Sequence, residues 1–305
     1  MKRSENRMLF VFVTPVVLIY ALIFLYPTIR TVLVSLFNMT SLSAPLNSQN
    51  FVGLQNYLDL LNNDLFKKAF VNVLLILFVG GASVFIVALF FANVLARKMR
   101  GKKFFRAIIY LPNVITPVAL VIMWTQYIFN NRFGMLHSIF SYLGLNSLAD
   151  FPWLSQSNVF WAMLIAFCFG AVGYYMVLFM AAIEQVPMDY YECASIEGAG
   201  KLTMFFRITL PLLRDTARTA VMFWCISALN FFVWAAVFTQ DMFFLPIITP
   251  STFMIGKAFG GQMGTASVSS INVGLSSAVG IVLTLCAVII FFIVNIVFKQ
   301  DKLEY

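Results

Sequence analysis

Six long apolar blocks dominate this sequence and restrict what it can fold into. They run approximately over residues 8–29, 70–96, 106–129, 159–183, 212–238 and 271–298. An α-helix of about 20 residues crosses a hydrocarbon core about 30 Å thick, and each block reaches that length. Across the chain 61% of residues are hydrophobic and only 10% are charged, whereas soluble domains carry about 25% charged residues. The solvent for this chain is therefore a lipid bilayer.

Continuous apolarity within the blocks also selects the secondary structure. In lipid, backbone polar groups are satisfied either inside a helix or around a closed barrel. Barrel strands alternate apolar and polar side chains, and these blocks do not alternate. The first block is longer than the apolar core of a signal peptide, and no small-residue cleavage site follows it. We therefore expect an all-α membrane protein with six transmembrane helices in one domain over residues 1–305.

The basic residues predict how the helices are oriented. Of the 20 Lys and Arg residues, all but five fall in the N-terminus, in 97–106, in 184–218 or in the C-terminus. Short cytoplasmic segments are enriched in Lys and Arg, so both termini are predicted to be cytoplasmic. The basic run at 97–106 is interpreted as an orientation signal with incidental lipid contact, and no nucleic-acid partner is expected.

The external segments and the histidine and cysteine residues predict neither a further domain nor a metal site. Segments 38–69, 130–158 and 239–270 are long enough for short interfacial helices and too short for another domain. The single histidine, His137, falls in one of them and is interpreted as a surface residue. The cysteines are isolated and are interpreted as packing thiols, with no metal site; they are Cys168, Cys193, Cys225 and Cys286.

The segment 186–211, between the fourth and fifth spans, predicts a helix, a glycine corner and a second helix. Pro187 stands at a favoured helix start, and acidic residues including Glu192 follow in the first turns, where they complement the positive helix end. Gly198 and Gly200 end this helix, and a second one follows before the fifth span. Local physics alone favours an ordinary capped surface loop.

The spacing of seven residues in this segment resembles the EAA loop of ABC importer permeases. That loop reads Glu-Ala-Ala, three residues, Gly, nine residues, Ile, one residue, then Leu-Pro. The matching positions here are Glu192, Cys193, Ala194, Gly198, Ile208, Leu210 and Pro211. Only Cys193 departs from the pattern, and because cysteine is also small, we expect docking to be retained.

Further stretches resemble the sugar-importing branch of this family, which includes maltose and glycerol-3-phosphate permeases. They are residues 51–57, 104–112, 134–136 and 274–278. The chain departs from the branch at 239–244, where the usual Gly-Gly-Pro stretch is replaced. This departure concerns the external gate and the contact with a binding protein.

The resemblance implies an assembly in the bacterial cytoplasmic membrane. Its other members are a second permease subunit, a homodimeric or heterodimeric ATPase and an extracytoplasmic solute-binding protein. The family's EAA helix seats in a groove of the ATPase, which gives Glu192 a basic partner there. The chain contains no G-x-x-x-x-G-K-[ST] motif. We therefore expect no enzyme activity and no cofactor in this chain, with ATP hydrolysed by the partner.

A sugar pathway requires aromatic faces for C–H surfaces and neutral polar groups for hydroxyls. Spans four and five offer such groups, with Asn230 and Trp234 expected on one helix face at i and i+4. The candidate pathway residues are Tyr174, Tyr175, Ser227, Asn230, Phe231 and Trp234. Packing against lipid or neighbouring helices is the alternative for each aromatic residue.

The expected function is that of a permease subunit for an oligosaccharide or related polyhydroxylated solute. One alternative is an importer for glycerol 3-phosphate or another anion, which the absence of a cation from the middle third of each span disfavours. Another is a stand-alone secondary carrier. Such carriers normally keep an ionisable group in mid-span, and the middle third of each span here has none.

Overall fold

The computed structural model describes residues 2–41, 50–96, 99–239, 241–260 and 271–298. Within these residues the regular elements are helices, apart from one isolated bridge between Phe37 and Phe51. By length and composition five helices in these residues are able to cross a membrane, and the number is six if a bent helix pair is counted as one span. The predicted all-α membrane fold is confirmed in these parts of the chain. The expected cytoplasmic C-terminus lies partly outside the described residues, as do positions 97–98, 240 and 261–270 of the segments considered above.

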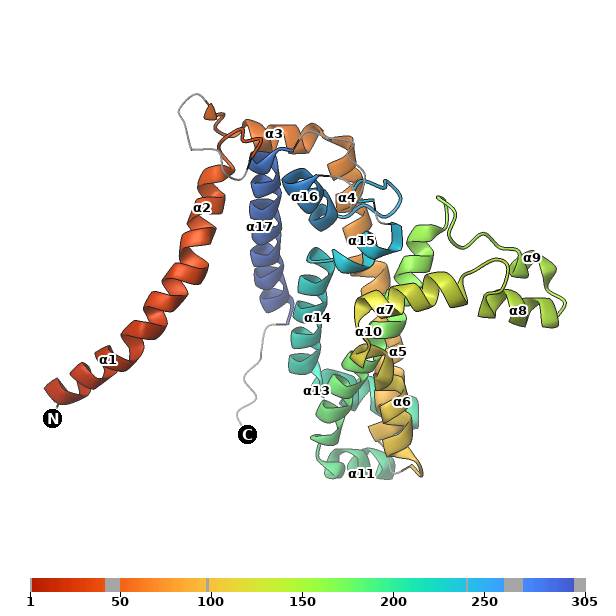
Figure 1. Cartoon of the computed structure of the whole chain (residues 1–305). Coiled ribbons are helices and arrows are strands. Elements are labelled where there is room, and N and C mark those ends of the chain that lie inside the picture. The colour runs from red at the N-terminus through yellow and green to blue at the C-terminus, as the bar shows by residue number, and fades with distance from the viewer. Residues whose placement is uncertain (1, 42–49, 97–98, 240, 261–270, 299–305) are drawn as a thin grey trace.

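The spans follow the apolar blocks closely (Figure 1). The first comprises α1 (Lys2–Tyr20), the π-helical turn η1 (Ala21–Leu25) and α2 (Tyr26–Val34). The second comprises α4 (Asp64–Leu75), η3 (Ile76–Gly80) and α5 (Gly81–Ala96). The fourth is α10 (Val159–Glu184), the fifth α14 (Arg214–Leu229) with α15 (Val233–Thr239), and the last α17 (Val273–Val297).

The third span is not the continuous helix expected over 106–129. It consists of α6 (Lys102–Val114), α7 (Pro117–Ile122) and η4 (Met123–Ile128), with a bend of 96° between α6 and the rest. Thr116 has extended backbone angles (φ −60°, ψ 142°). Because Pro117 follows, its ring excludes Thr116 from the helical region. The bend therefore has a local steric cause.

The fifth span is also interrupted, at residues 230–232, where helical hydrogen bonding lapses between α14 and α15. Two hydroxyl groups from a distant segment donate to backbone carbonyls at the break, in place of the backbone N–H groups of a continuous helix. Ser251 Oγ donates to the Leu229 carbonyl at 2.7 Å, and Thr249 Oγ1 donates to that of Phe231 at 2.8 Å. Both hydroxyls belong to the N-terminal end of α16 (Pro250–Phe259). The break is thus satisfied within the protein, as non-helical backbone at membrane depth must be.

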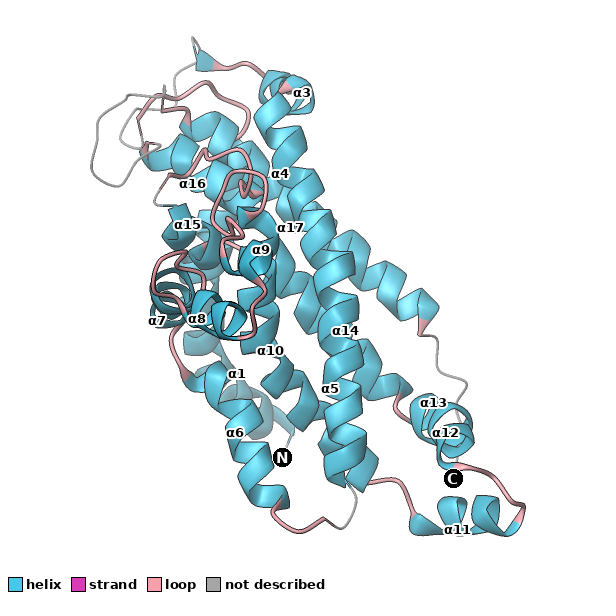
Figure 2. Cartoon of the chain, turned by 90° about the vertical axis from the view of Figure 1, so that its right-hand side faces the viewer, coloured by secondary structure: helices cyan, strands magenta, loops and turns pink. Residues whose placement is uncertain are grey.

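Short helices lie at both ends of the bundle (Figures 1 and 2). One end carries α3 (Gln55–Asn62) and α16, and α8 (Met135–Tyr142) with α9 (Asn146–Ala149) projects sideways from the bundle. The opposite end carries α11 (Met188–Ile196), α12 (Lys201–Met204) and α13 (Leu210–Leu212). The external segments thus hold short helices and no further domain in their described parts.

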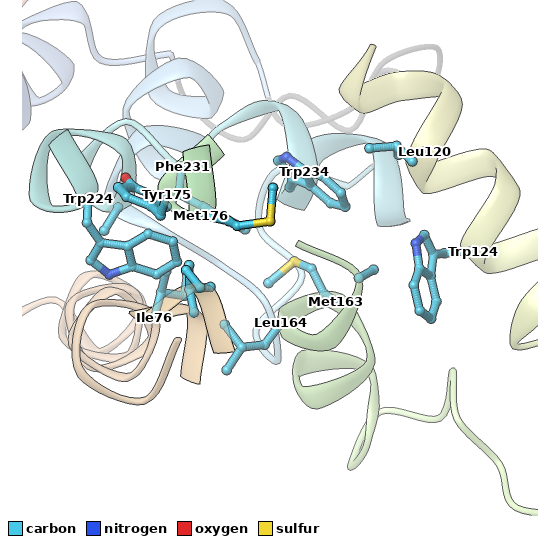
Figure 3. Close-up of a cluster of buried hydrophobic side chains, with 14 of the residues drawn as sticks. Ile76, Leu120, Trp124, Met163, Leu164, Tyr175, Met176, Trp224, Phe231 and Trp234 are labelled. Carbon is cyan, nitrogen blue, oxygen red and sulfur yellow. The ribbon is translucent and has the colours of Figure 1, made fainter. Parts of the chain in front are cut away.

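The core forms around α10, which packs against α5 and α6. Trp224 of α14 is 2% exposed and lies against Phe167 and Tyr175 of α10. Figure 3 shows this region, with Tyr175 and Trp224 close together and Ile76 beside them. Gly81 makes the approach possible, since a Cβ atom there would lie 2.6 Å from the Trp224 indole nitrogen.

The first span stands away from the rest of the molecule. Its α2 end contacts α17, while α1 diverges from the bundle (Figure 1). None of the most apolar window within Val11–Val34 is buried inside the chain. An apolar helix of this kind needs lipid or another protein around it.

Candidate substrate cavity and coupling segment

A cavity of about 470 Å³ opens between the bend of the third span and the fourth and fifth spans. Its lining residues come from α6, the α6–α7 bend, α7, α10, α14 and α15. They are Pro112, Asn113, Ile115, Pro117, Leu120, Phe167, Gly170, Ala171, Tyr174, Tyr175, Phe223, Trp224, Ile226, Ser227 and Trp234. The volume falls within the range of small-molecule sites, about 300–1,000 Å³.

Four of the six candidate pathway residues line this cavity, namely Tyr174, Tyr175, Ser227 and Trp234. Phe231 is 2% exposed and packs edge-on against Phe167, so it supports the wall from behind. Asn230 is exposed, and its side-chain amide donates to the Ile226 carbonyl at 3.1 Å. The expected shared face of Asn230 and Trp234 is wrong, because the helix breaks between them.

The bend of the third span contributes lining that the sequence analysis did not assign to the pathway. Pro112, Asn113, Ile115 and Pro117 come from this region. The Asn113 amide donates to the Gly170 carbonyl at 3.5 Å, which links the bend to α10. Pro112 and Pro117 could have indicated this bend from the sequence, since prolines free backbone acceptors and permit kinks in membrane helices.

The chemistry of the cavity is aromatic and neutral. Six lining residues carry aromatic rings, and no Asp, Glu, Lys, Arg or His belongs to the lining. Trp224 uses its indole N–H internally, donating to the Leu77 carbonyl at 2.9 Å. The other polar side-chain groups of the lining are the Ser227 hydroxyl, two tyrosine hydroxyls, the Trp234 indole N–H and the Asn113 carboxamide. This combination suits a ligand with both apolar faces and neutral hydrogen-bonding groups.

The segment 186–211 has the predicted shape of a helix, a corner and a second helix. α11 ends at Ile196, and Gly198 follows with φ +77°, a left-handed conformation that favours glycine. The Ala199 N–H donates to the Ala194 carbonyl at 2.9 Å, closing the corner. Beyond the corner, α12 continues through the π-helical turn η5 (Phe205–Thr209) into α13.

The motif residues divide into exposed and packed groups. Glu192, Cys193 and Gly198 are exposed, whereas Ala194 is half-buried. In the second helix Ile208 and Leu210 are half-buried, and Pro211 is exposed beside the start of α14. The segment therefore presents one side of α11 outward while its second helix rests on the bundle.

Two polar contacts hold this segment and the helix end that precedes it, and neither was predicted: one joins the two helices of the segment, and the other joins α10 to α6. The Tyr191 and Thr209 hydroxyls lie 3.0 Å apart, and Thr209 is only 2% exposed. Glu184, the last residue of α10, forms an ion pair with Lys102 at the start of α6. The segment 186–211 thus follows a helix end that is tied to the third span.

Comparison with solved structures identifies the class of fold. The chain superimposes on a bacterial ABC transporter involved in the import of the acidic polysaccharide alginate, with a TM-score of 0.80 and 17% identity over 98% of this chain and 97% of that one. The same transporter in complex with an alginate pentasaccharide-bound periplasmic protein gives a TM-score of 0.78 at 19% identity. The chain therefore shares its fold with a chain of this transporter.

Sequence comparison then identifies the family. Residues 84–300 match the model described as "Binding-protein-dependent transport system inner membrane component". This chain belongs to that family, which confirms the expected multi-pass permease of the inner membrane and assigns it to transport rather than to enzyme catalysis.

Individual relatives carry names that specify solutes. The permease NgcF of a diacetylchitobiose uptake system in Streptomyces coelicolor is 35% identical over 61% of this chain, which covers 55% of that relative's length. The trehalose/maltose permease MalF of Thermococcus litoralis is 28% identical over 76% of this chain and 77% of the relative. The sn-glycerol-3-phosphate permease UgpA of Pectobacterium atrosepticum is 25% identical over 67% of each.

Proposed function

We propose that this chain forms half of the translocation pathway of an ATP-driven importer for a neutral oligosaccharide or related polyhydroxylated solute. The observation that carries this proposal is the cavity wall of aromatic and neutral polar side chains without a charged group. Sugars present C–H faces to aromatic rings and hydroxyls to neutral hydrogen-bonding groups, so this wall complements both parts of such a ligand.

The names of the relatives support a carbohydrate and leave its charge open. Diacetylchitobiose, trehalose and maltose are named for two of them, and glycerol 3-phosphate for a third. A site for phosphate or carboxylate normally supplies Arg or Lys in a charge-assisted hydrogen bond. Because the lining here has neither, the cavity favours a neutral sugar.

Coupling to ATP hydrolysis is assigned to the segment 186–211. In this proposal α11 seats in a groove of a partner ATPase, and the exposed Glu192 carboxylate meets a basic residue there. Closure of the ATPase dimer then moves α11 and, through the Tyr191–Thr209 contact, the start of the fifth span. That span carries Ser227 and Trp234 of the cavity wall, so the movement reaches the substrate.

Two further partners complete the assembly. A second permease subunit supplies the other half of the pathway and covers part of the unburied first span. A solute-binding protein delivers the sugar at the end of the bundle opposite the coupling segment, in keeping with the family's dependence on binding proteins.

A strain from which this chain has been deleted tests the substrate class. The deletion is expected to abolish saturable uptake of one labelled neutral oligosaccharide from a panel of chitobiose, maltose, trehalose and longer homologues, and a plasmid copy restores it. Loss of glycerol 3-phosphate uptake alone would instead support the anionic-solute importer, which the UgpA relative favours.

A further inference from the structure

A second cavity, of about 350 Å³, lies at the end of the bundle away from the coupling segment and shares no lining residue with the substrate cavity. Its walls come from α4, from the start of α10 with the residues preceding it, and from the segment before α16. The lining residues are Lys68, Asn72, Leu75, Gln156, Ser157, Phe160, Trp161, Leu245 and Pro246.

Helix length places this cavity at the level of the lipid headgroups. The second span is helical over Asp64–Ala96, 33 residues, whereas about 20 residues cross the hydrocarbon core. Counting about 20 residues from Ala96 ends near Leu77, which leaves Lys68 and Asn72 beyond the hydrocarbon. The same count from Glu184 along the 26 residues of α10 leaves Trp161 at the interface. Trp and Lys are residues typical of this depth.

The polar part of the cavity favours an anion. Lys68 supplies an ammonium group, and Phe160 and Trp161 belong to the first turn of α10, where the helix dipole is positive. Gln156 and Ser157 add neutral donors just before that turn. No acidic residue is part of the lining.

A buried amide beside the cavity has an unused acceptor. Asn72 is fully buried, and its Nδ2 donates to the Ile248 carbonyl at 2.8 Å and the Pro246 carbonyl at 3.2 Å. These bonds fix the orientation of the amide, and its Oδ1 has no hydrogen-bond partner among the described residues. A buried acceptor without a partner is costly, and phosphate oxygens cannot satisfy it because they are acceptors too; within a phosphatidylglycerol headgroup only a glycerol hydroxyl can donate to it.

The remaining walls are apolar, from Leu75, Phe160, Leu245 and Pro246. A lining that combines an ammonium group and neutral donors with apolar side chains suits a phospholipid at the boundary between its headgroup and its acyl chains. We propose that this cavity binds the headgroup of an anionic phospholipid, with its phosphate at Lys68 and the α10 N-terminus. The site is separate from the pathway, so this proposal stands independently of which sugar is carried.

Spin-labelled lipids test the proposal on the assembled transporter in vesicles. Phosphatidylglycerol is expected to associate several-fold more strongly than phosphatidylcholine with the wild-type protein. Lys68→Gln weakens the association of phosphatidylglycerol about fivefold, which is about 1 kcal/mol. Lys67→Gln is the matched control, because Lys67 is the adjacent exposed lysine, pairs with Asp64 and does not line the cavity.

A second variant and a competition arm make the outcome decisive. Leu245 is 48% exposed at the cavity, and Leu245→Glu places an acid there that repels an anionic headgroup. This variant is expected to remove the preference for phosphatidylglycerol while assembly is retained. Equal association of the two lipids, equal behaviour of the two lysine variants, or displacement of phosphatidylglycerol by millimolar inorganic phosphate or free sugar would each overturn the lipid assignment.

Discussion

At the scale of single residues, the proposed coupling segment, residues 186–211, contains some side chains that maintain its shape and others that are exposed on its surface. Thr209 is buried and Gly198 holds a left-handed backbone, so both serve the shape of the segment. Glu192 and Cys193 are exposed on α11. An exposed side chain can be replaced with little effect on folding, so Glu192 can be tested separately from the fold.

Glu192→Ala is expected to lower ATP-dependent uptake at least tenfold while the subunit inserts and assembles normally. The physical reason is that removal of one member of a buried charged pair at an interface costs about 2–5 kcal/mol. Glu197→Ala is the control, because Glu197 is exposed in the same segment and outside the motif. Wild-type uptake by Glu192→Ala vesicles would remove Glu192 from the coupling role.

Tyr174→Ala is expected to raise the KM for sugar uptake about fivefold, since an aromatic contact contributes about 1 kcal/mol. Tyr174 lines the cavity, whereas the exposed Tyr127 does not, and Tyr127→Ala is therefore the control. Initial uptake rates over a range of sugar concentrations measure both.

Asn230→Leu, measured in parallel, lowers uptake if the pathway continues from the cavity across the exposed face of α14.

At the scale of elements, the sequence predicts the existence of the spans better than their interruptions. The expected block at 159–183 differs from α10 by one residue, because continuous apolarity over this length has one solution in a bilayer. The bend of the third span was harder to place. Pro112 lies inside α6 without ending it, whereas Pro117 coincides with the 96° turn. Proline composition alone does not distinguish these two cases.

The break in the fifth span explains why Asn230 and Trp234, four residues apart, do not share a helix face. Its position depends on hydroxyl donors from Thr249 and Ser251, which follow the break by about twenty residues. The pattern of apolar residues within the span cannot predict these donors, because they belong to a different segment of the chain. Pathway residues Ser227 and Trp234 nevertheless lie at one cavity, because each is placed by its own helix on either side of the break.

Gly173→Ala tests the packing of the third span on the fourth. A Cβ atom at this position would lie 2.5 Å from the Ile109 carbonyl oxygen and 2.8 Å from the Tyr110 Cα, both backbone atoms that cannot rotate away. We expect a loss of about 1–3 kcal/mol in unfolding free energy, the usual cost of overpacking. Denaturant unfolding of the purified subunit measures it. Gly200→Ala is the control, since no atom lies within 4 Å of its added Cβ; equal stability of both variants would contradict the packing.

At the scale of the whole molecule, the chain is incomplete as an isolated object. The first span has none of its most apolar window buried, and α11 carries the exposed Glu192. The substrate cavity is open rather than enclosed by this chain alone, with Tyr174 37% exposed at its wall. These features agree with a subunit that works within a larger membrane complex.

Assembly is expected to shield the first span. Ile19 is 59% exposed in the isolated chain, so a spin label at Ile19→Cys is accessible to oxygen dissolved in the bilayer. Addition of the second permease subunit is expected to lower this accessibility at least twofold. Unchanged accessibility along the whole of Val11–Val34 would show that lipid alone surrounds this helix.

The most direct test of the account is uptake into proteoliposomes that contain this chain with its second permease subunit, its ATPase and its solute-binding protein. We expect saturable uptake of a neutral oligosaccharide that stops when ATP or the binding protein is omitted. Uptake by this chain without the ATPase, or uptake restricted to glycerol 3-phosphate, would contradict it.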